Sequence, residues 1–149
     1  MKVAIGCDHG GYPLKQDVIE AITAAGHEPM DLGTYGPESV DYVDYAVKVA
    51  EAILAGEAEL GILTCGTGIG MSIAANKING IYAARAEDCY SARMAREHNA
   101  ANVLCLGART AGPELIKESV RSFLAGQPST DARHQRRRDK FYALESRQQ

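Results

Sequence analysis

Short apolar runs alternate with amphipathic segments along the whole chain. Apolar residues within the segments recur at the three- and four-residue spacing of a helix face, whereas the runs have the length and composition of buried strands. The predicted strands cover residues 3–6, 28–32, 60–64, 81–84 and 102–106. Strands that alternate with helices predict right-handed βαβ units and a parallel sheet covered on both faces.

The predicted helices are bounded by residues typical of helix ends. Prolines stand in the first turns of two of them, glycines follow three, and Asp88 is placed to cap another. The predicted helices begin near Pro13, before Tyr45, near Gly70, at Asp88, at Pro113 and at Ala132. We expect a single three-layer α/β/α, doubly wound (Rossmann-like) domain over residues 1–149, with a five-stranded parallel sheet and a C-terminal helical arm at about 132–146.

Composition narrows the class of protein. The chain has 149 residues, of which 46% are hydrophobic, and no apolar run approaches the ~20 residues of a membrane span. The first residues form a predicted strand and a Gly-His loop, which is not the pattern of a signal peptide. The four cysteines show no C-x-x-C pair and no zinc-ligand spacing. We expect a cytoplasmic protein with reduced thiols, no metal and no membrane partner.

Charge is unevenly distributed. Residues 1–130 carry 10 basic and 16 acidic side chains, and residues 131–149 carry 6 basic and 3 acidic ones. An acidic body with a small basic tail argues against nucleic-acid binding, which favours a basic face over the whole domain. A local site for a small anion remains compatible with this distribution.

Three loops at the predicted carboxyl ends of strands carry polar and small residues. Ligands of open parallel sheets bind at this edge. The loops are Gly6-Cys7-Asp8-His9-Gly10-Gly11, Cys65-Gly66-Thr67-Gly68-Ile69-Gly70 and Gly107-Ala108-Arg109.

The loop at 65–70 has the backbone freedom to turn several N–H groups toward one anion. It does not fit the common phosphate motifs: Met71 stands where G-x-G-x-x-G needs a third glycine and where a cysteine phosphatase needs arginine, and Thr67 stands where a P-loop needs lysine. The alternative is a tight strand-to-helix turn with an incidental cysteine.

Cys65 at the start of this loop has two chemical interpretations. Cysteine thiols at helix N-termini are more acidic than free ones, so the thiolate can act near neutral pH as a nucleophile or as a base. Neighbouring N–H groups would stabilise an oxyanion, as proton abstraction beside a carbonyl requires, and acyl transfer requires the same. The residues alone do not decide between the two.

Each of the other candidate residues also has an explanation that involves no ligand. His98 can exchange protons near neutral pH or simply complement a helix C-terminus. Asp8 and His9 can contact a ligand, or form a turn and remain solvated. Arg133 and Arg137 lie four residues apart on one predicted helix face, a spacing that suits a phosphate dianion but also an ordinary basic helix.

Six sequence blocks carry a resemblance to a known family. They are G-C-D-H-G-G-Y at 6–12, S-V-D-Y at 39–42, T-C-G-T-G-I-G-M-S-I-A-A-N-K at 64–77, Y-S-A-R-M-A-R-E-H-N at 90–99, N-V-L-C-L-G-A-R at 102–109 and R-H-Q-R-R at 133–137. Together these blocks, which span essentially the whole chain, resemble type B ribose-5-phosphate isomerases, whose family includes galactose-6-phosphate and allose-6-phosphate isomerases.

The resemblance implies a metal-independent, cofactor-free isomerase that interconverts D-ribose 5-phosphate and D-ribulose 5-phosphate through an enediolate in the non-oxidative pentose phosphate pathway. A six-carbon substrate, allose 6-phosphate or galactose 6-phosphate, is the alternative. The family's pattern makes Cys65 the base, with Gly66, Thr67, Gly68, Ile69 and Gly70 around the enediolate oxygens. It assigns ring opening to His98 and Asp8, substrate contact to Asn99, and phosphate binding to His9, Arg109, Arg133 and Arg137.

The same resemblance implies a homodimer or a dimer of dimers whose active sites combine both subunits, with His98 and its neighbours supplied by the partner. Four positions depart from the family's usual pattern: Val43, Tyr82, Ala100 and Arg138. Because Tyr82 and Ala100 could alter the surroundings of the site, they bear on sugar preference rather than on reaction type.

Two other classes make different predictions. A thiol hydrolase that forms a thioester would show burst kinetics and a covalent adduct at Cys65, whereas the isomerase exchanges solvent hydrogen into the sugar without an adduct. A non-catalytic nucleotide or flavin module would bind its ligand tightly, but the glycine patterns do not support it.

Overall fold

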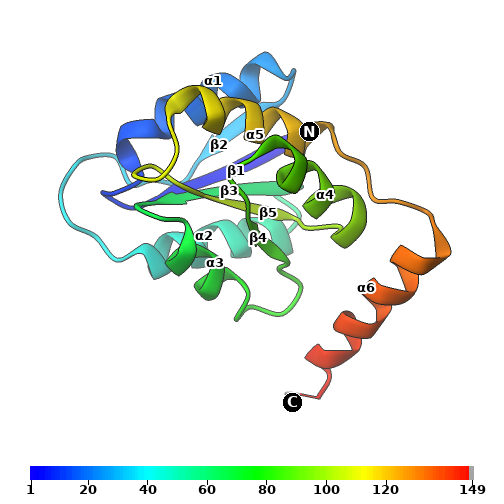
Figure 1. Ribbon diagram of the computed structural model, residues 1–149. Coiled ribbons are helices and arrows are strands. Elements are labelled where there is room, and N and C mark those ends of the chain that lie inside the picture. Colours follow the sequence, from blue (N-terminus) through cyan, green and yellow to red (C-terminus); the bar gives the residue numbers. More distant parts are fainter. Residues whose placement is uncertain (148–149) are drawn as a thin grey trace.

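A five-stranded, wholly parallel sheet forms the centre of the protein, as the alternation of strands and helices predicted. The computed structural model describes residues 1–147, so the last two residues of the expected domain lie outside the described part. The strands run in the order β2-β1-β3-β5-β4 (Figure 1). Their bounds are β1 Lys2–Cys7, β2 Glu28–Asp31, β3 Leu60–Cys65, β4 Ala83–Arg85 and β5 Val103–Gly107.

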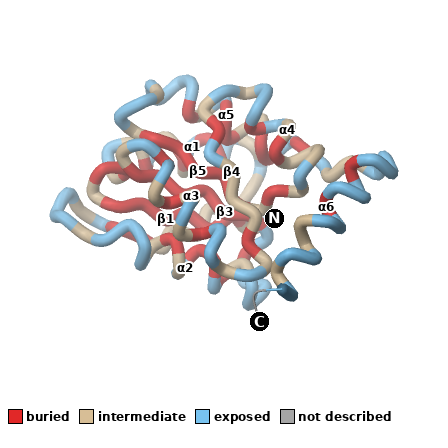
Figure 2. The backbone as a smooth tube through the Cα atoms, turned by 60° about the horizontal axis from the view of Figure 1, so that its bottom comes forward, coloured by how far each residue is buried: buried red, intermediate tan, exposed pale blue. Residues whose placement is uncertain are grey.

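Two apolar layers cover the sheet, one on each face. The helices are η1 Tyr12–Leu14, α1 Lys15–Ala24, α2 Tyr42–Leu54, α3 Ile69–Ala75, α4 Cys89–Asn99, α5 Pro113–Ala125 and α6 Ala132–Glu145. One buried cluster joins residues of α1, α4 and α5 to the sheet, and the other joins residues of α2 and α3 to the opposite face. The central strands are accordingly buried along nearly their whole length (Figure 2).

Several predicted boundaries were wrong by one or two residues, and two of these differences have a clear local cause. Strand β4 begins at Ala83 rather than at residue 81. The backbone N–H of the residue before it does not pair with a neighbouring strand, because Tyr82 N donates to the side-chain oxygen Asn102 Oδ1 at 2.8 Å. Helix α3 covers residues 69–75 rather than 70–77. Its start is set by Gly68, whose φ of 75° lies in the left-handed region that glycine adopts without strain.

Helix α6 leaves the body of the domain and is tied back through α4 (Figure 1). The buried Arg138 guanidinium donates to His98 O at 3.2 Å and to Ser129 O at 2.8 Å. Further along, the ring of Tyr82 packs on Phe141 with centroids 5.4 Å apart. Arg138 and Tyr82 therefore anchor the arm. Among the helices of residues 1–147, none combines the length and hydropathy needed to cross a bilayer.

Candidate active site

Cys65 is the last residue of β3, at the carboxyl edge in the middle of the sheet. Its side chain is 4% exposed, and its Sγ accepts a hydrogen bond from Gly68 N at 3.1 Å. The chain therefore turns back on the cysteine and presents a donor to it.

The following loop is held in one conformation by close packing. A Cβ on Gly68 would lie 3.0 Å from Leu106 C, and Ile69 N donates to Thr67 Oγ1 at 3.3 Å. The N–H groups in the first turn of α3 have no carbonyl partner within the helix. They lie beside Cys65 and can stabilise negative charge that develops on an oxygen there.

The loop after β1 packs directly against this loop. Gly11 lies so close to β3 that a Cβ would stand 2.2 Å from Thr64 O, which explains why only glycine fits there. Asp8 is buried, and its Oδ1 accepts from Gly11 N at 2.9 Å. Asp8 thus forms a turn, the alternative to ligand contact given in the sequence analysis, while its side chain remains at the sheet edge that carries Cys65.

His9 ties a third segment to the site. Its Nδ1 accepts from Val40 N at 3.2 Å, which holds the chain that leads into α2. A neutral imidazole that accepts at Nδ1 carries its proton at Nε2, so the other side of the ring is a donor. The contact fixes the ring while leaving it a hydrogen to offer to an anion.

Arg109 follows β5 and lies over the glycine loop. Its backbone N donates to Gly66 O at 2.9 Å, and its Nη1 is 3.1 Å from where a Cβ on Gly66 would be. A guanidinium in this position brings positive charge to the edge where Cys65 lies.

A polar network that the sequence analysis did not predict supports the glycine loop from the side of β4. Arg85 Nε donates to Thr67 O at 2.9 Å, and Arg85 Nη2 lies 2.9 Å from Glu87 Oε2. Glu87 Oε1 accepts from Gly107 N at 2.9 Å and also from the Thr110 hydroxyl. The sequence signal was two opposite charges two residues apart at the end of a predicted strand, where alternate side chains share a face.

The other predicted residues lie at the opposite end of the sheet in the same copy. Helix α4 starts after the carboxyl end of β4 and runs back to the amino end of β5. Its last two residues, His98 and Asn99, therefore lie near Asn102 at the amino end of the sheet, whereas Cys65 lies at the carboxyl end. The five residues of β5 separate the two ends by on the order of 15 Å. One copy of the chain therefore does not bring His98 or Asn99 to Cys65.

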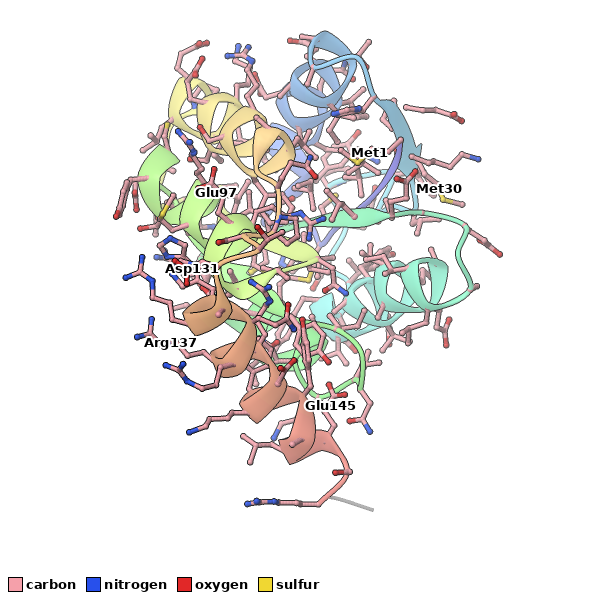
Figure 3. All side chains as sticks on the ribbon, turned by 90° about the vertical axis from the view of Figure 1, so that its right-hand side faces the viewer. Met1, Met30, Glu97, Asp131, Arg137 and Glu145 are labelled. Atoms are coloured by element: carbon pink, nitrogen blue, oxygen red, sulfur yellow. The ribbon has the colours of Figure 1, made fainter. Side chains whose placement is uncertain are left out.

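His98 belongs to a second cluster at that end. Its ring packs on buried His134 with centroids 4.1 Å apart. Burial, followed by the neighbouring His98 and Arg133, lowers the pKa of His134. Arg133 pairs with Asp131 at 3.2 Å, and Arg137, one turn along, is exposed and points outward from α6 (Figure 3).

The two other buried thiols that flank the site are poor candidates for proton transfer. Burial raises the pKa of Cys7 to about 11, and burial followed by the nearby Cys65 raises the pKa of Cys105 still further. Both remain protonated near neutral pH. All four cysteines are free, and residues 1–147 contain no group of three or more His, Cys, Asp or Glu side chains arranged to hold a metal ion.

Comparison with known proteins places this arrangement in a family. The model of the Ribose/Galactose Isomerase family matches residues 3–141. Ribose-5-phosphate isomerase B of Escherichia coli is 45% identical over 146 residues, which is 98% of this chain and 97% of that protein. D-erythrulose-4-phosphate isomerase of Pectobacterium atrosepticum is 45% identical over 126 residues, 83% of this chain and 82% of the relative.

A solved structure agrees over nearly the whole fold. Type B ribose 5-phosphate isomerase of Trypanosoma brucei superimposes with a TM-score of 0.93 at 50% identity, covering 96% of this chain and 97% of that one. The fold and the loop around Cys65 define a sugar-phosphate isomerase. The chain belongs to the Ribose/Galactose Isomerase family.

Proposed function

We propose that this enzyme interconverts D-ribose 5-phosphate and D-ribulose 5-phosphate, with Cys65 as the base. The observation that carries the proposal is the buried Cys65 Sγ, hydrogen-bonded by Gly68 N in the glycine loop that leads into α3. The similarity to ribose-5-phosphate isomerase B of E. coli supports this substrate.

The chemistry follows from that placement. The Cys65 thiolate removes the proton from C2 of the open-chain aldose, the electron pair forms the C1–C2 double bond, and negative charge moves to O1. Backbone N–H groups of Gly66 to Gly70 stabilise this enediolate. The Thr67 hydroxyl passes a proton between O2 and O1. The Cys65 thiol exchanges its proton with solvent while the enediolate is bound and then protonates C1, which gives the ketose.

Substrate binding uses the remaining predicted residues. His98 opens the furanose ring with the help of Asp8, and Asn99 contacts the sugar hydroxyls. The phosphate is held by His9, which donates from Nε2, and by Arg109, Arg133 and Arg137, whose charges match a dianion. Phosphate binding positions the reacting carbons and contributes to the rate through orientation.

The active enzyme is a homodimer, or a dimer of dimers, with sites that combine two copies. The separation of His98 from Cys65 within one copy supports this assembly. Apolar side chains exposed beside the glycine loop, on α2 and α3, also support it: Tyr42, Val43, Ile69 and Ile73 are 40–59% exposed. A second copy that covers this patch would bring its own α4 and α6 to Cys65. The free cysteines favour a cytoplasmic location.

The test is turnover of ribose 5-phosphate with EDTA present, with allose 6-phosphate, galactose 6-phosphate and D-erythrulose 4-phosphate assayed in parallel. EDTA-resistant conversion of ribose 5-phosphate as the preferred substrate is the expected result. Preference for a six-carbon or four-carbon sugar would keep the reaction and change the substrate. No conversion of any of the four would overturn the isomerase proposal.

A further inference from the structure

Arg85 contacts the glycine loop although it lies two strands away from it. It ends the edge strand β4, and its side chain crosses the end of β5 to reach the loop after β3. Arg85 Nε donates to Thr67 O at 2.9 Å, and the Arg85 side-chain stem would stand 3.2 Å from a Cβ on Gly68. The contact is made to backbone, so it depends on the position of the loop rather than on which side chain residue 67 carries.

The carbonyl that Arg85 binds and the N–H that binds Cys65 belong to the same peptide unit. Thr67 C=O and Gly68 N–H are joined by one planar amide bond, so they point in opposite directions. Arg85 Nε donates to the oxygen, and Gly68 N donates to Cys65 Sγ at 3.1 Å. Any rotation of this peptide that breaks the first hydrogen bond also turns the N–H away from sulfur.

The guanidinium is itself fixed. Arg85 Nη2 lies 2.9 Å from Glu87 Oε2 and donates to Thr110 Oγ1 at 3.4 Å. Glu87 in turn accepts from Gly107 N at 2.9 Å, which anchors the pair to the end of β5. These contacts engage Nε and Nη2 of Arg85, so both of these donor atoms are used within the protein.

We propose that Arg85 is a positioning residue for Cys65, which holds and polarises the Thr67–Gly68 peptide so that its N–H remains on the sulfur. A cationic donor on a carbonyl makes the N–H at the other end of the amide a stronger donor, as in any chain of hydrogen bonds. The proposal rests on the proposed role of Cys65 as base. Two charged groups, Asp8 and Arg109, lie in the loops that pack against the glycine loop, and the protonated Cys105 thiol lies near Cys65.

The experiment compares Arg85→Met with the wild type in two assays. Methionine keeps an unbranched stem against Gly68 but removes the donor and the charge. The first assay alkylates the protein with iodoacetamide between pH 6 and 10, without sugar phosphate, and quantifies the Cys65 peptide by mass spectrometry. We expect alkylation at pH 7 to slow about 3- to 10-fold, the range for loss of one hydrogen bond, with the same plateau rate at high pH.

The plateau rate of alkylation at high pH distinguishes a change in the position of the loop around Cys65 from a change in how accessible the sulfur is to iodoacetamide. A lower rate at every pH would mean that the sulfur had become less accessible, and it would overturn the proposal, as would an unchanged profile. Arg121→Met is the matched control, because Arg121 pairs with Glu118 on the exposed side of α5 and should leave the profile unchanged. If Arg85→Met does not fold, Arg85→Leu, which likewise removes the donor and the charge, is measured with the same expectation and the same two contradicting outcomes.

The second assay measures turnover of ribose 5-phosphate. Arg85→Met should lower kcat about 3- to 10-fold with KM nearly unchanged, and Arg85→Lys, which keeps the charge, should recover part of the loss. A raised KM with unchanged kcat would instead make Arg85 a substrate contact. Because alkylation needs no substrate, an inactive wild type would contradict the proposed function while leaving the first assay to decide the role of Arg85.

Discussion

The backbone N–H of Gly68 donates to the Sγ of Cys65 across 3.1 Å, and this pairing distinguishes Cys65 from the other buried thiols. Cys7 Sγ lies instead 3.8 Å from Thr34 O, a carbonyl acceptor. Burial raises the pKa of Cys7 to about 11. Both cysteines end central strands in the same sheet, and only Cys65 is followed by the glycine loop.

A shared active site predicts a specific pattern of complementation. Differently tagged chains allow heterodimers to be purified. A dimer of one Cys65→Ala chain and one His98→Gln/Arg137→Ala chain should retain about half of the wild-type turnover, because one of its two sites is intact if each site uses both copies. Steady-state turnover of the purified heterodimer is the measurement.

The matched control places all three changes in one chain and pairs it with a wild-type chain. That heterodimer should be nearly inactive, because each of its sites then contains an altered residue. If the sites were not shared the two results would be exchanged, with the first heterodimer inactive and the control half-active.

Arg137→Ala should chiefly weaken substrate binding. Loss of one charge-assisted contact to phosphate is expected to raise KM about 10- to 100-fold, with a smaller effect on kcat. Arg136→Ala provides the control, since Arg136 is an equally exposed arginine of α6 at a different angle around the helix. Equal effects of the two substitutions in steady-state kinetics would indicate a general charge effect and no defined phosphate contact.

The close approach of Gly11 to β3 predicts a large loss of stability on adding one methyl group. A Cβ there would stand 2.2 Å from Thr64 O, so Gly11→Ala must displace either the loop or the strand. We expect it to cost about 1–3 kcal/mol in the free energy of unfolding measured in urea. Gly112→Ala, where nothing lies within 4 Å, should stay within about 0.5 kcal/mol of the wild type. Similar losses for both would mean that the packing is looser than described.

Most of the fold, and the meeting of the loops that follow β1, β3 and β5 at one sheet edge, were predictable from the sequence for identifiable reasons. Strand and helix periodicity is a local property, and Pro113, Gly26 and Asp88 mark helix ends locally as well; Asp88 caps α4 by accepting from Ser91 N at 2.7 Å, as predicted. The loops of Cys65 and Asp8 meet because parallel strands end at one edge. Local patterns sufficed for these features.

Long-range pairings were not predictable in the same way. The hydrogen bond from Arg85 to Thr67 depends on the strand order, which places β4 at the edge beyond β5. The tie between Arg138 and His98 O depends on where α6 folds back. The resemblance to a family supplied the expectation that His98 acts at a partner's site, which no pattern within one chain contains.

His134 predicts a pH dependence of stability. Burial, His98 and Arg133 lower the pKa of His134, so the unfolded chain binds this proton more tightly than the folded one. The stability gained from neutral His134 is complete above the ordinary pKa of 6.5 and is lost as the pH falls through that value toward the lowered pKa.

Thermal melts at pH 8 and pH 5.5 measure this effect. The Tm of the wild type should fall more between the two pH values than that of His134→Leu, which has no proton to bind. His27→Gln, changed at a histidine far from α6 in the sequence, should fall as much as the wild type. An equal fall for wild type and His134→Leu would show that His134 does not contribute to the acid sensitivity.

The central claim is that Cys65 moves a proton between the sugar carbons and solvent. Conversion of ribose 5-phosphate in D₂O with EDTA, followed by NMR, tests it most directly. The wild type is predicted to form ribulose 5-phosphate that carries deuterium at C1, and Cys65→Ala is predicted to bind the sugar phosphate without converting it. Product formed without deuterium, or turnover retained by Cys65→Ala, would contradict the account.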